Sequence, residues 1–239
     1  MSYGSIVILT GAGISAESGI PTFRADDGLW ENYKVTEIAT PSGFKKDPEK
    51  VLRFYNDRRQ AMMSETIRPN PAHLALADLE AHYPGDVYIV TQNIDPLHEK
   101  AGSQKVFHMH GEILKARCIK SDEIFPWSSA FGIETLCPCC QQPGRLRPHI
   151  VWFGEMPFYM EDIDDLLETC GLFISIGTSG EVYPAAGFVN WARQNRAYCI
   201  ELNPRPTYNP SFHTFIEGTA GNEVPNLVRS ILDGSLKTH

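Results

Sequence analysis

Two glycines that directly follow an apolar run are the first residues whose types and spacing could do chemistry. The run IVIL at 6–9 predicts a buried strand, and Gly11, Gly13 and Ala16 follow it with the spacing Gly-x-Gly-x-x-Gly/Ala. The bare backbone N–H groups of such a turn, together with the dipole of a following helix, can hold a pyrophosphate. A plain glycine turn between strand and helix is the alternative, which a further glycine at Gly19 makes less favoured.

The glycine motif does not continue as it does in two common classes of nucleotide-binding protein. A dehydrogenase holds the ribose of NAD with an acidic residue at the end of a second strand, about 20 positions later. Here Glu31 follows Trp30 in a stretch without strand character. No Gly-Lys-Ser/Thr follows the glycines either, which disfavours an NTP-binding P-loop.

Polar segments follow three further predicted strands. They are TQNID at 91–95, HMHG at 108–111 and GTS at 177–179. The first offers amides and a carboxylate around the apolar Ile94, as a site for ribose hydroxyls, an amide and an aromatic ring would, and the third offers hydroxyls. Because the carboxyl ends of parallel strands meet at one edge of a sheet, we expect all three to face the same edge. Each segment alone also suits an ordinary turn or helix start.

The hydrophobic pattern indicates the elements that must position these segments. Apolar runs predict strands at 5–10, 86–91, 105–108, 149–152, 171–176 and 197–202, and helical patterns occupy 47–63, 70–82, 160–169, 184–195 and 223–233. Strands that alternate with helices predict an α/β fold, a Rossmann-like parallel sheet with helices on both faces. Residues 24–82, helical without a strand, and 111–148, short, Pro-rich and Cys-bearing, break the alternation, and we expect them to form a small inserted lobe.

Composition limits the class of partner. The 239 residues are 42% hydrophobic and carry a net charge of −8, which fits one large domain, or a core domain with an insertion, and argues against nucleic acid or anionic membrane as the partner. No N-terminal signal pattern is seen, and no apolar run approaches the ~18 residues of a membrane span, so we expect a cytoplasmic protein. Six cysteines in such a chain suggest a metal site or inert core thiols more than disulfides.

The motifs together resemble those of a known family. GAGISAESGIPTFR, TQNID, the His-Gly of HMHG, and GTS followed by ELN are similar, in order along the whole chain, to the sirtuins, which are NAD-dependent protein lysine deacylases. The resemblance implies that NAD binds between the Rossmann-type lobe and the small lobe. The residues that it implies for NAD binding are Gly11, Ala12, Gly13, Phe23, Arg24, Trp30, Gln92, Asn93, Ile94, Asp95, Gly177, Thr178, Ser179, Asn203 and Ala220.

The resemblance also implies that His110 is the catalytic base. Cleavage of nicotinamide from NAD builds oxocarbenium character at the ribose carbon, the acyl-lysine carbonyl oxygen captures it, and a base then removes a hydroxyl proton. A histidine with a pKa near neutrality suits that step. Asp95 and Ile94 would hold the carboxamide of nicotinamide away from water. The alternative is that His110 is a hydrogen-bonded core histidine.

The metal site departs from the sirtuin pattern, which has Cys-x-x-Cys twice around a structural zinc. Here the first pair is reduced to Cys118, with Ser121 where the second thiolate would fall, and the second pair is the cluster CPCC at 137–140. We expect zinc on Cys118, Cys137 and Cys140, with water or a carboxylate such as Glu123 as fourth ligand. A weak or empty site is the alternative.

Tyr55 and Arg58 lie three residues apart in a predicted helix and therefore share a face. In class III sirtuins a Tyr-x-x-Arg at this place recognises the carboxylate of succinyl- or malonyl-lysine, so the resemblance implies that role here. Arg53 and Arg59 are adjacent in sequence, so the alternative is a solvated basic helix face. By the same resemblance, WFGE at 152–155 would pair its backbone with the substrate peptide.

The sequence thus predicts a monomeric NAD-dependent protein lysine deacylase of the bacterial class III type. It would act on acetyl-, succinyl- or malonyl-lysine in proteins, release nicotinamide and transfer the acyl group to ADP-ribose. Two alternatives stay open. One is a non-catalytic NAD- or ADP-ribose-sensing module, which would not need His110, and the other is a mono-ADP-ribosyltransferase.

Overall fold

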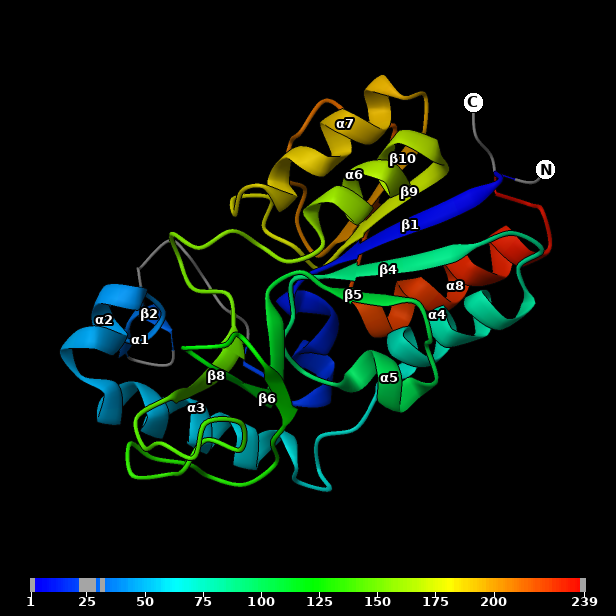
Figure 1. Cartoon of the computed structure of the whole chain (residues 1–239). Coiled ribbons are helices and arrows are strands. Elements are labelled where there is room, and N and C mark those ends of the chain that lie inside the picture. Colours follow the sequence, from blue (N-terminus) through cyan, green and yellow to red (C-terminus); the bar gives the residue numbers. More distant parts are fainter. Residues whose placement is uncertain (1–2, 22–28, 31–32, 237–239) are drawn as a thin grey trace.

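A six-stranded parallel sheet forms the centre of the larger lobe in this computed structural model, which describes residues 3–21, 29–30 and 33–236 (Figure 1). Its strands are β1 (Ser5–Thr10), β4 (Val87–Thr91), β5 (Val106–His108), β9 (Cys170–Ile176), β10 (Tyr198–Asn203) and β11 (Thr214–Glu217). Their order across the sheet is β11-β10-β9-β1-β4-β5, and each neighbouring pair is parallel. The chain order therefore reverses between β1 and β9, which is where open α/β sheets bind ligands. The predicted Rossmann-like parallel sheet is confirmed.

Helices cover both faces of this sheet. One face packs against η1 (Ala12–Ser18), α4 (Pro71–His82) and α8 (Ala220–Leu232), and the other against α6 (Met160–Thr169), η2 (Ala185–Gly187) and α7 (Phe188–Gln194) (Figure 1). Along β1, Ile6 and Ile8 point into the first core and Val7 and Leu9 into the second. Burial on both faces explains why the strands read as continuous apolar runs. The short α5 (Leu97–Ala101) follows β4.

The small lobe lies beyond the carboxyl ends of the large sheet's strands (Figure 1). It contains the helices α1 (Val35–Ile38), α2 (Pro41–Lys46) and α3 (Pro48–Met62), the short pair β2 (Leu29–Trp30) and β3 (Tyr33–Lys34), and an antiparallel sheet of β6 (Gly111–Cys118), β7 (Ile124–Pro126) and β8 (Leu146–Ile150). Its core packs Phe54 and Tyr55 of α3 against Ile113 of β6 and Trp152.

Several expectations about the lobes were wrong. Residues 24–82 are not free of strands, since β2 and β3 pair there, and the strand expected at 149–152 is β8, which pairs with β6 in the small sheet. The segment 71–82 does not belong to the small lobe, because α4 buries Ala72, Leu76 and Leu79 against the large sheet. A short apolar run carries no information about which strand it pairs with, so local sequence did not reveal these partners.

Within the described ranges, no helix is both long enough and apolar enough to cross a membrane.

Candidate active site

The glycine loops after β1 and β9 touch each other backbone to backbone. The Gly11 N–H donates to Ile176 O (3.0 Å) and the Gly13 N–H donates to Gly177 O (2.8 Å). A Cβ on Gly13 would lie 2.7 Å from Gly177 Cα, which real side chains do not tolerate. Protein carbonyls thus accept from both of these N–H groups, and binding of NAD by Gly11, Ala12 and Gly13 stays a prediction. The glycines allow two loops to meet at the point where the strand order reverses.

Three amide side chains connect the carboxyl ends of the strands around this contact between the two loops. Gln92 Nε2 donates to Thr178 Oγ1 (3.0 Å), Asn203 Nδ2 donates to Thr178 O (2.8 Å), and Asn93 Nδ2 donates to Gly11 O (3.2 Å). These bonds join the loops that follow β1, β4, β9 and β10. The prediction that the polar segments face one edge of the sheet is confirmed.

Asp95 is a buried carboxylate at this edge, with 4% of its surface exposed. Its Oδ2 accepts from Ser15 Oγ (3.0 Å) and its Oδ1 from the Leu97 N–H (3.1 Å). Burial raises the pKa of Asp95, and these two hydrogen bonds oppose that rise. Ser15 also accepts from Asn93 Nδ2 (3.1 Å) and so links two predicted residues. Sequence reasoning missed Ser15, although it lies inside the glycine motif.

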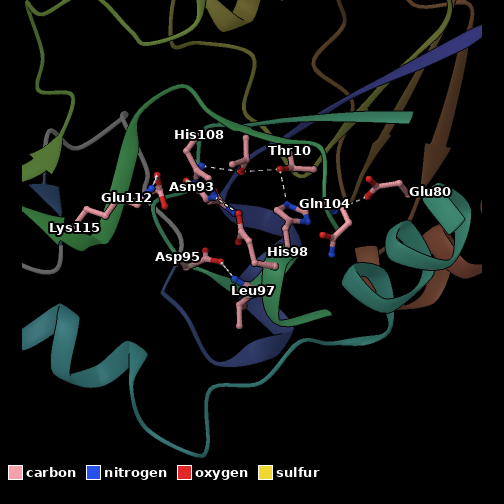
Figure 2. Close-up of polar contacts among 12 residues, drawn as sticks. Thr10, Glu80, Asn93, Asp95, Leu97, His98, Gln104, His108, Glu112 and Lys115 are labelled. Carbon is pink, nitrogen blue, oxygen red and sulfur yellow. Dashed lines mark hydrogen bonds and ion pairs between the residues drawn. The ribbon is translucent and has the colours of Figure 1, made fainter. Parts of the chain in front are cut away.

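A layer of histidines and threonines lies beneath the loop, and Figure 2 shows Thr10 and His98 of this layer. Thr10 Oγ1 donates to Thr91 Oγ1 (2.8 Å), so it accepts from His98 Nε2 (3.0 Å), and His98 carries its proton on Nε2. Burial lowers the pKa of His98 well below its ordinary value and that of His73 to about 4. Both rings are therefore neutral at physiological pH. His73 Nε2 lies 3.5 Å from Ser15 Oγ. No local motif pointed to these residues.

His110 lies half-buried in the turn between β5 and β6. Its Nδ1 is 3.1 Å from Gln92 O. Since a carbonyl can only accept, Nδ1 carries the proton and Nε2 keeps a lone pair. Burial lowers the pKa of His110, and the bond to Gln92 opposes this only in part. The geometry therefore provides a neutral imidazole at the sheet edge, with a basic nitrogen left over, which is what a general base requires.

Tyr55 and Arg58 are buried on α3, so the alternative of a solvated helix face is wrong for this pair. The Tyr55 hydroxyl accepts from Trp152 Nε1 (3.0 Å), and Arg58 Nη1 donates to Phe54 O (3.0 Å). The Arg58 guanidinium stacks 3.2 Å from the centroid of the Phe54 ring. Trp30 packs edge-on against Phe54, with the ring centroids 5.1 Å apart. We call the rings of Trp30, Phe54, Tyr55 and Trp152 the α3 aromatic cluster.

The segment after β8 is held by an ion pair that sequence reasoning missed. Arg147 Nη1 lies 2.6 Å from Glu155 Oε1, and Glu155 Oε2 accepts from the Trp152 N–H (2.8 Å). Between the anchored ends, Phe153 stays 47% exposed. The ion pair fixes the backbone of the WFGE segment next to the α3 aromatic cluster, because Trp152 is the first residue of that segment and its ring belongs to the cluster.

Four cysteines form the candidate metal centre. The Sγ atoms of Cys118, Cys137, Cys139 and Cys140 all lie within 4.8 Å of one another. Four thiolates at such spacing fit a tetrahedral zinc site. The expected fourth ligand, water or Glu123, is thereby replaced by Cys139. The prediction missed Cys139 because it assumed the Cys-x-x-Cys spacing. Cys139 supplies the fourth thiol, which in that spacing would come from a cysteine at position 121.

The comparisons with known proteins agree with this geometry. The Sir2 family profile matches residues 11–184. A relative from Vibrio cholerae serotype O1, named NAD-dependent protein deacylase, is 56% identical over 233 residues, which cover 97% of this chain and 95% of the relative. The chain belongs to the Sir2 family.

Solved structures of Sir2 proteins share the fold. A mutant Sir2 homologue in complex with ADP-ribose matches with a TM-score of 0.87 and 40% identity, over 98% of this chain and 95% of that one. Sir2Af2 bound to a myristoylated histone peptide matches with a TM-score of 0.74 and 32% identity, over 97% of this chain and 92% of that one. The Sir2 fold extends over both lobes of the chain.

The other residues of this Sir2 chain that were predicted to contact NAD lie in different surroundings. Ile94 is half-buried, and its carbonyl accepts from the Ile113 N–H (2.9 Å). Ser179 is exposed in the loop after β9, and Ala220 is the buried first residue of α8. Trp30 lies in the α3 aromatic cluster, so its contact with NAD stays a prediction. Phe23 and Arg24 lie outside the described residues.

Proposed function

We propose that this Sir2-family chain is an NAD-dependent protein lysine deacylase that transfers the acyl group to ADP-ribose and releases nicotinamide. The observation that carries the proposal is His110, a neutral imidazole with a free Nε2, at the same sheet edge as the contact between the Gly13 and Gly177 loops. A nucleotide-sensing module would have no use for a base at this place.

The reaction divides among the residues at this edge. NAD supplies an electrophilic ribose carbon when its bond to nicotinamide breaks. Asp95 and Ile94 would bind the carboxamide, and Gln92 and Asn93, with Ser15 hydrogen-bonded to both Asn93 and Asp95, would form a polar wall around the ribose. After the acyl oxygen attacks the ribose carbon, His110 Nε2 removes a ribose hydroxyl proton, and the resulting alkoxide attacks the acyl carbon. Addition of one water to the acyl carbon and departure of the lysine amine then give the products, which are free lysine, nicotinamide and O-acyl-ADP-ribose.

We further propose that Tyr55 and Arg58 select acyl groups that end in a carboxylate. Arg58 brings a buried cation to the α3 aromatic cluster, on the same face of α3 as the hydroxyl of Tyr55. A succinyl or malonyl carboxylate would form a charge-assisted hydrogen bond with this guanidinium. Within the described chain no acceptor takes the Tyr55 hydroxyl proton, so Tyr55 could donate to the same carboxylate.

The two lobes would act as one catalytic domain over 1–239, with the small lobe built from the segments between η1 and α4 and from 111–148. A zinc ion on the four cysteines would be structural, because Cys118 and Cys137 lie in the small lobe's own core next to Phe131 and Leu146. The substrates are acylated lysines in proteins. We propose a monomer that works in the cytoplasm without nucleic acid.

The experiment measures nicotinamide release from NAD with and without an acetylated or succinylated peptide. A deacylase releases nicotinamide in step with deacylation and only when the acylated peptide is present. Release without an acyl group, with ADP-ribose left on protein, would indicate an ADP-ribosyltransferase instead. Binding of NAD with no release under either condition would indicate a sensing module.

A further inference from the structure

His108 is a second histidine at the sheet edge, two residues before His110, and the proposed mechanism does not use it. Its Nδ1 lies 3.1 Å from Asn93 O, just as His110 Nδ1 lies 3.1 Å from Gln92 O. The two rings therefore hold two consecutive carbonyls of the loop after β4. This loop carries the residues proposed to bind ribose and nicotinamide.

The two histidines differ in what faces Nε2. His108 Nε2 lies 2.6 Å from Glu99 Oε1, whereas His110 Nε2 is left as a base. Since Asn93 O can only accept, His108 Nδ1 carries a proton, and a neutral ring would then turn a bare nitrogen toward a carboxylate. Only the doubly protonated ring satisfies both partners. The His108 side chain is 6% exposed, so this is a buried imidazolium.

The charges around His108 come from three elements. They are Glu99 and the neutral His98 on α5, Asp95 in the loop after β4, and Glu112 with its partner Lys115 on β6. Burial alone would lower the pKa of His108, but the hydrogen bond and the charge of Glu99 raise it above its ordinary value. The positive charge of His108 in turn favours the ionised form of Asp95, against the effect of that carboxyl's burial.

We propose that His108, held as an imidazolium by Glu99, is a positioning residue that fixes the Asn93 carbonyl and keeps Asp95 ionised for nicotinamide binding. This inference rests on the proposed function. Figure 2 shows Asn93, Asp95 and His108 close together at the ends of β4 and β5. A neutral residue at 108 would lose both effects, because it could neither donate with the strength of a cation nor offset the Asp95 charge.

The test compares His108→Gln and Glu99→Gln with His82→Gln, which alters a histidine in an exposed pair with Asp78 (3.0 Å). With the wild type active, His108→Gln should lower kcat/KM for NAD and the rate of nicotinamide exchange by about 10- to 100-fold, the range for a lost charge-assisted hydrogen bond. KM for the acylated peptide should change less than about twofold. His82→Gln should match the wild type.

The pH profile separates this role from a merely structural one. His108 is charged below its raised pKa, so the wild type should lose activity as the pH rises through that pKa. Glu99→Gln removes the group that raises the pKa of His108, so this variant should begin to lose activity at a lower pH than the wild type. At the acid end of the profile its activity should be near that of the wild type. Glu99 is 44% exposed, which makes this variant the safer one to fold.

Each outcome has one meaning. An inactive wild type would contradict the proposed function. If the wild type is active, a His108→Gln variant with wild-type activity would overturn this inference and leave the proposed function intact. A Glu99→Gln variant whose activity is reduced equally at every pH would do the same. If His108→Gln does not fold, NMR titration of the wild-type His108 ring decides, since a ring that is neutral at pH 7 excludes the imidazolium.

Discussion

Histidines 98, 108 and 110 lie at the same sheet edge, and their neighbours give them different protonation states. His98 is buried against a threonine hydroxyl and is neutral, His108 lies between a carbonyl and a carboxylate and is charged, and His110 meets one carbonyl and keeps a basic nitrogen. The residue type is the same in each case. Burial and the atoms that face the two ring nitrogens together decide what each histidine can do.

For His110 the first prediction is loss of catalysis without loss of fold. His110→Ala should reduce deacylation by about 100- to 10,000-fold, the usual effect of removing a general base, while ADP-ribose binding changes little. Calorimetric titration with ADP-ribose alongside the rate assay provides the check. Near-normal turnover would remove His110 from the mechanism.

The acid limb of the wild-type rate reports the same residue. His110 acts as a base only when neutral, and burial lowers its pKa below the ordinary 6.5. Deacylation should therefore fall as the pH drops, with its half-point below pH 6.5. A kcat/KM profile between pH 5 and 9 measures it, and a half-point clearly above the ordinary value would contradict the assignment.

Arg58→Met tests the selection of acyl groups. An acetyl group has no charge to pair with Arg58, whereas a succinyl carboxylate would lose a charge-assisted hydrogen bond of roughly 1.5–3 kcal/mol. We expect kcat/KM for the succinyl peptide to fall about 10- to 150-fold and that for the acetyl peptide to fall much less. One peptide sequence carrying either acyl group gives the ratio, and an unchanged ratio refutes the role.

At the scale of elements, the contact between the β1 and β9 loops gives a stability prediction. Gly13→Ala would force a methyl group into the backbone of Gly177, and overpacking of this kind costs about 1–3 kcal/mol. Tm should fall by several degrees and NAD binding should weaken. Gly132→Ala is the matched control, because nothing lies within 4 Å of its new Cβ. Equal melting of the two variants would contradict the reading.

Five of the six strands of the large sheet could be predicted, and four of these are apolar runs because both of their faces are buried. A strand that exposes much of its surface, or whose partner lies far along the chain, was harder to find or to place. β11 is half-exposed along most of its four residues and was not foreseen, and β8 was foreseen at the wrong place in the fold, since its partner β6 lies about thirty residues away. Antiparallel partners at that distance leave no local signal.

Much of the candidate site could be predicted where its residues lie at strand ends. Gln92, Asn93 and Thr178 meet as the parallel topology requires. Residues from outside these ends were missed. The ion pair of Arg147 with Glu155 and the layer under the loop depend on contacts that no spacing in the sequence announces.

At the scale of the whole molecule, the small lobe should depend on its metal. We expect one zinc per chain, and Cys139→Ser should lose it as Cys118→Ser does, because all four thiols converge. Ser121→Ala is the control and should keep the zinc, since its hydroxyl is not needed as a ligand. Elemental analysis of freshly purified protein gives the count. A full zinc complement in Cys139→Ser would exclude Cys139 as the fourth ligand.

The order of strands in the large sheet has a consequence for the nascent chain. β1 is synthesised first, but in the finished sheet it lies in the middle, between β4 and β9. Its partner β9 spans Cys170–Ile176 and is therefore synthesised much later. At 5–20 residues per second the edge of β1 that later meets β9 waits roughly 10–35 s without a partner. Its apolar residues are then open to pairing with other chains. Truncations that end before β9 should therefore aggregate, and the protein should depend on chaperones during synthesis more than its size suggests.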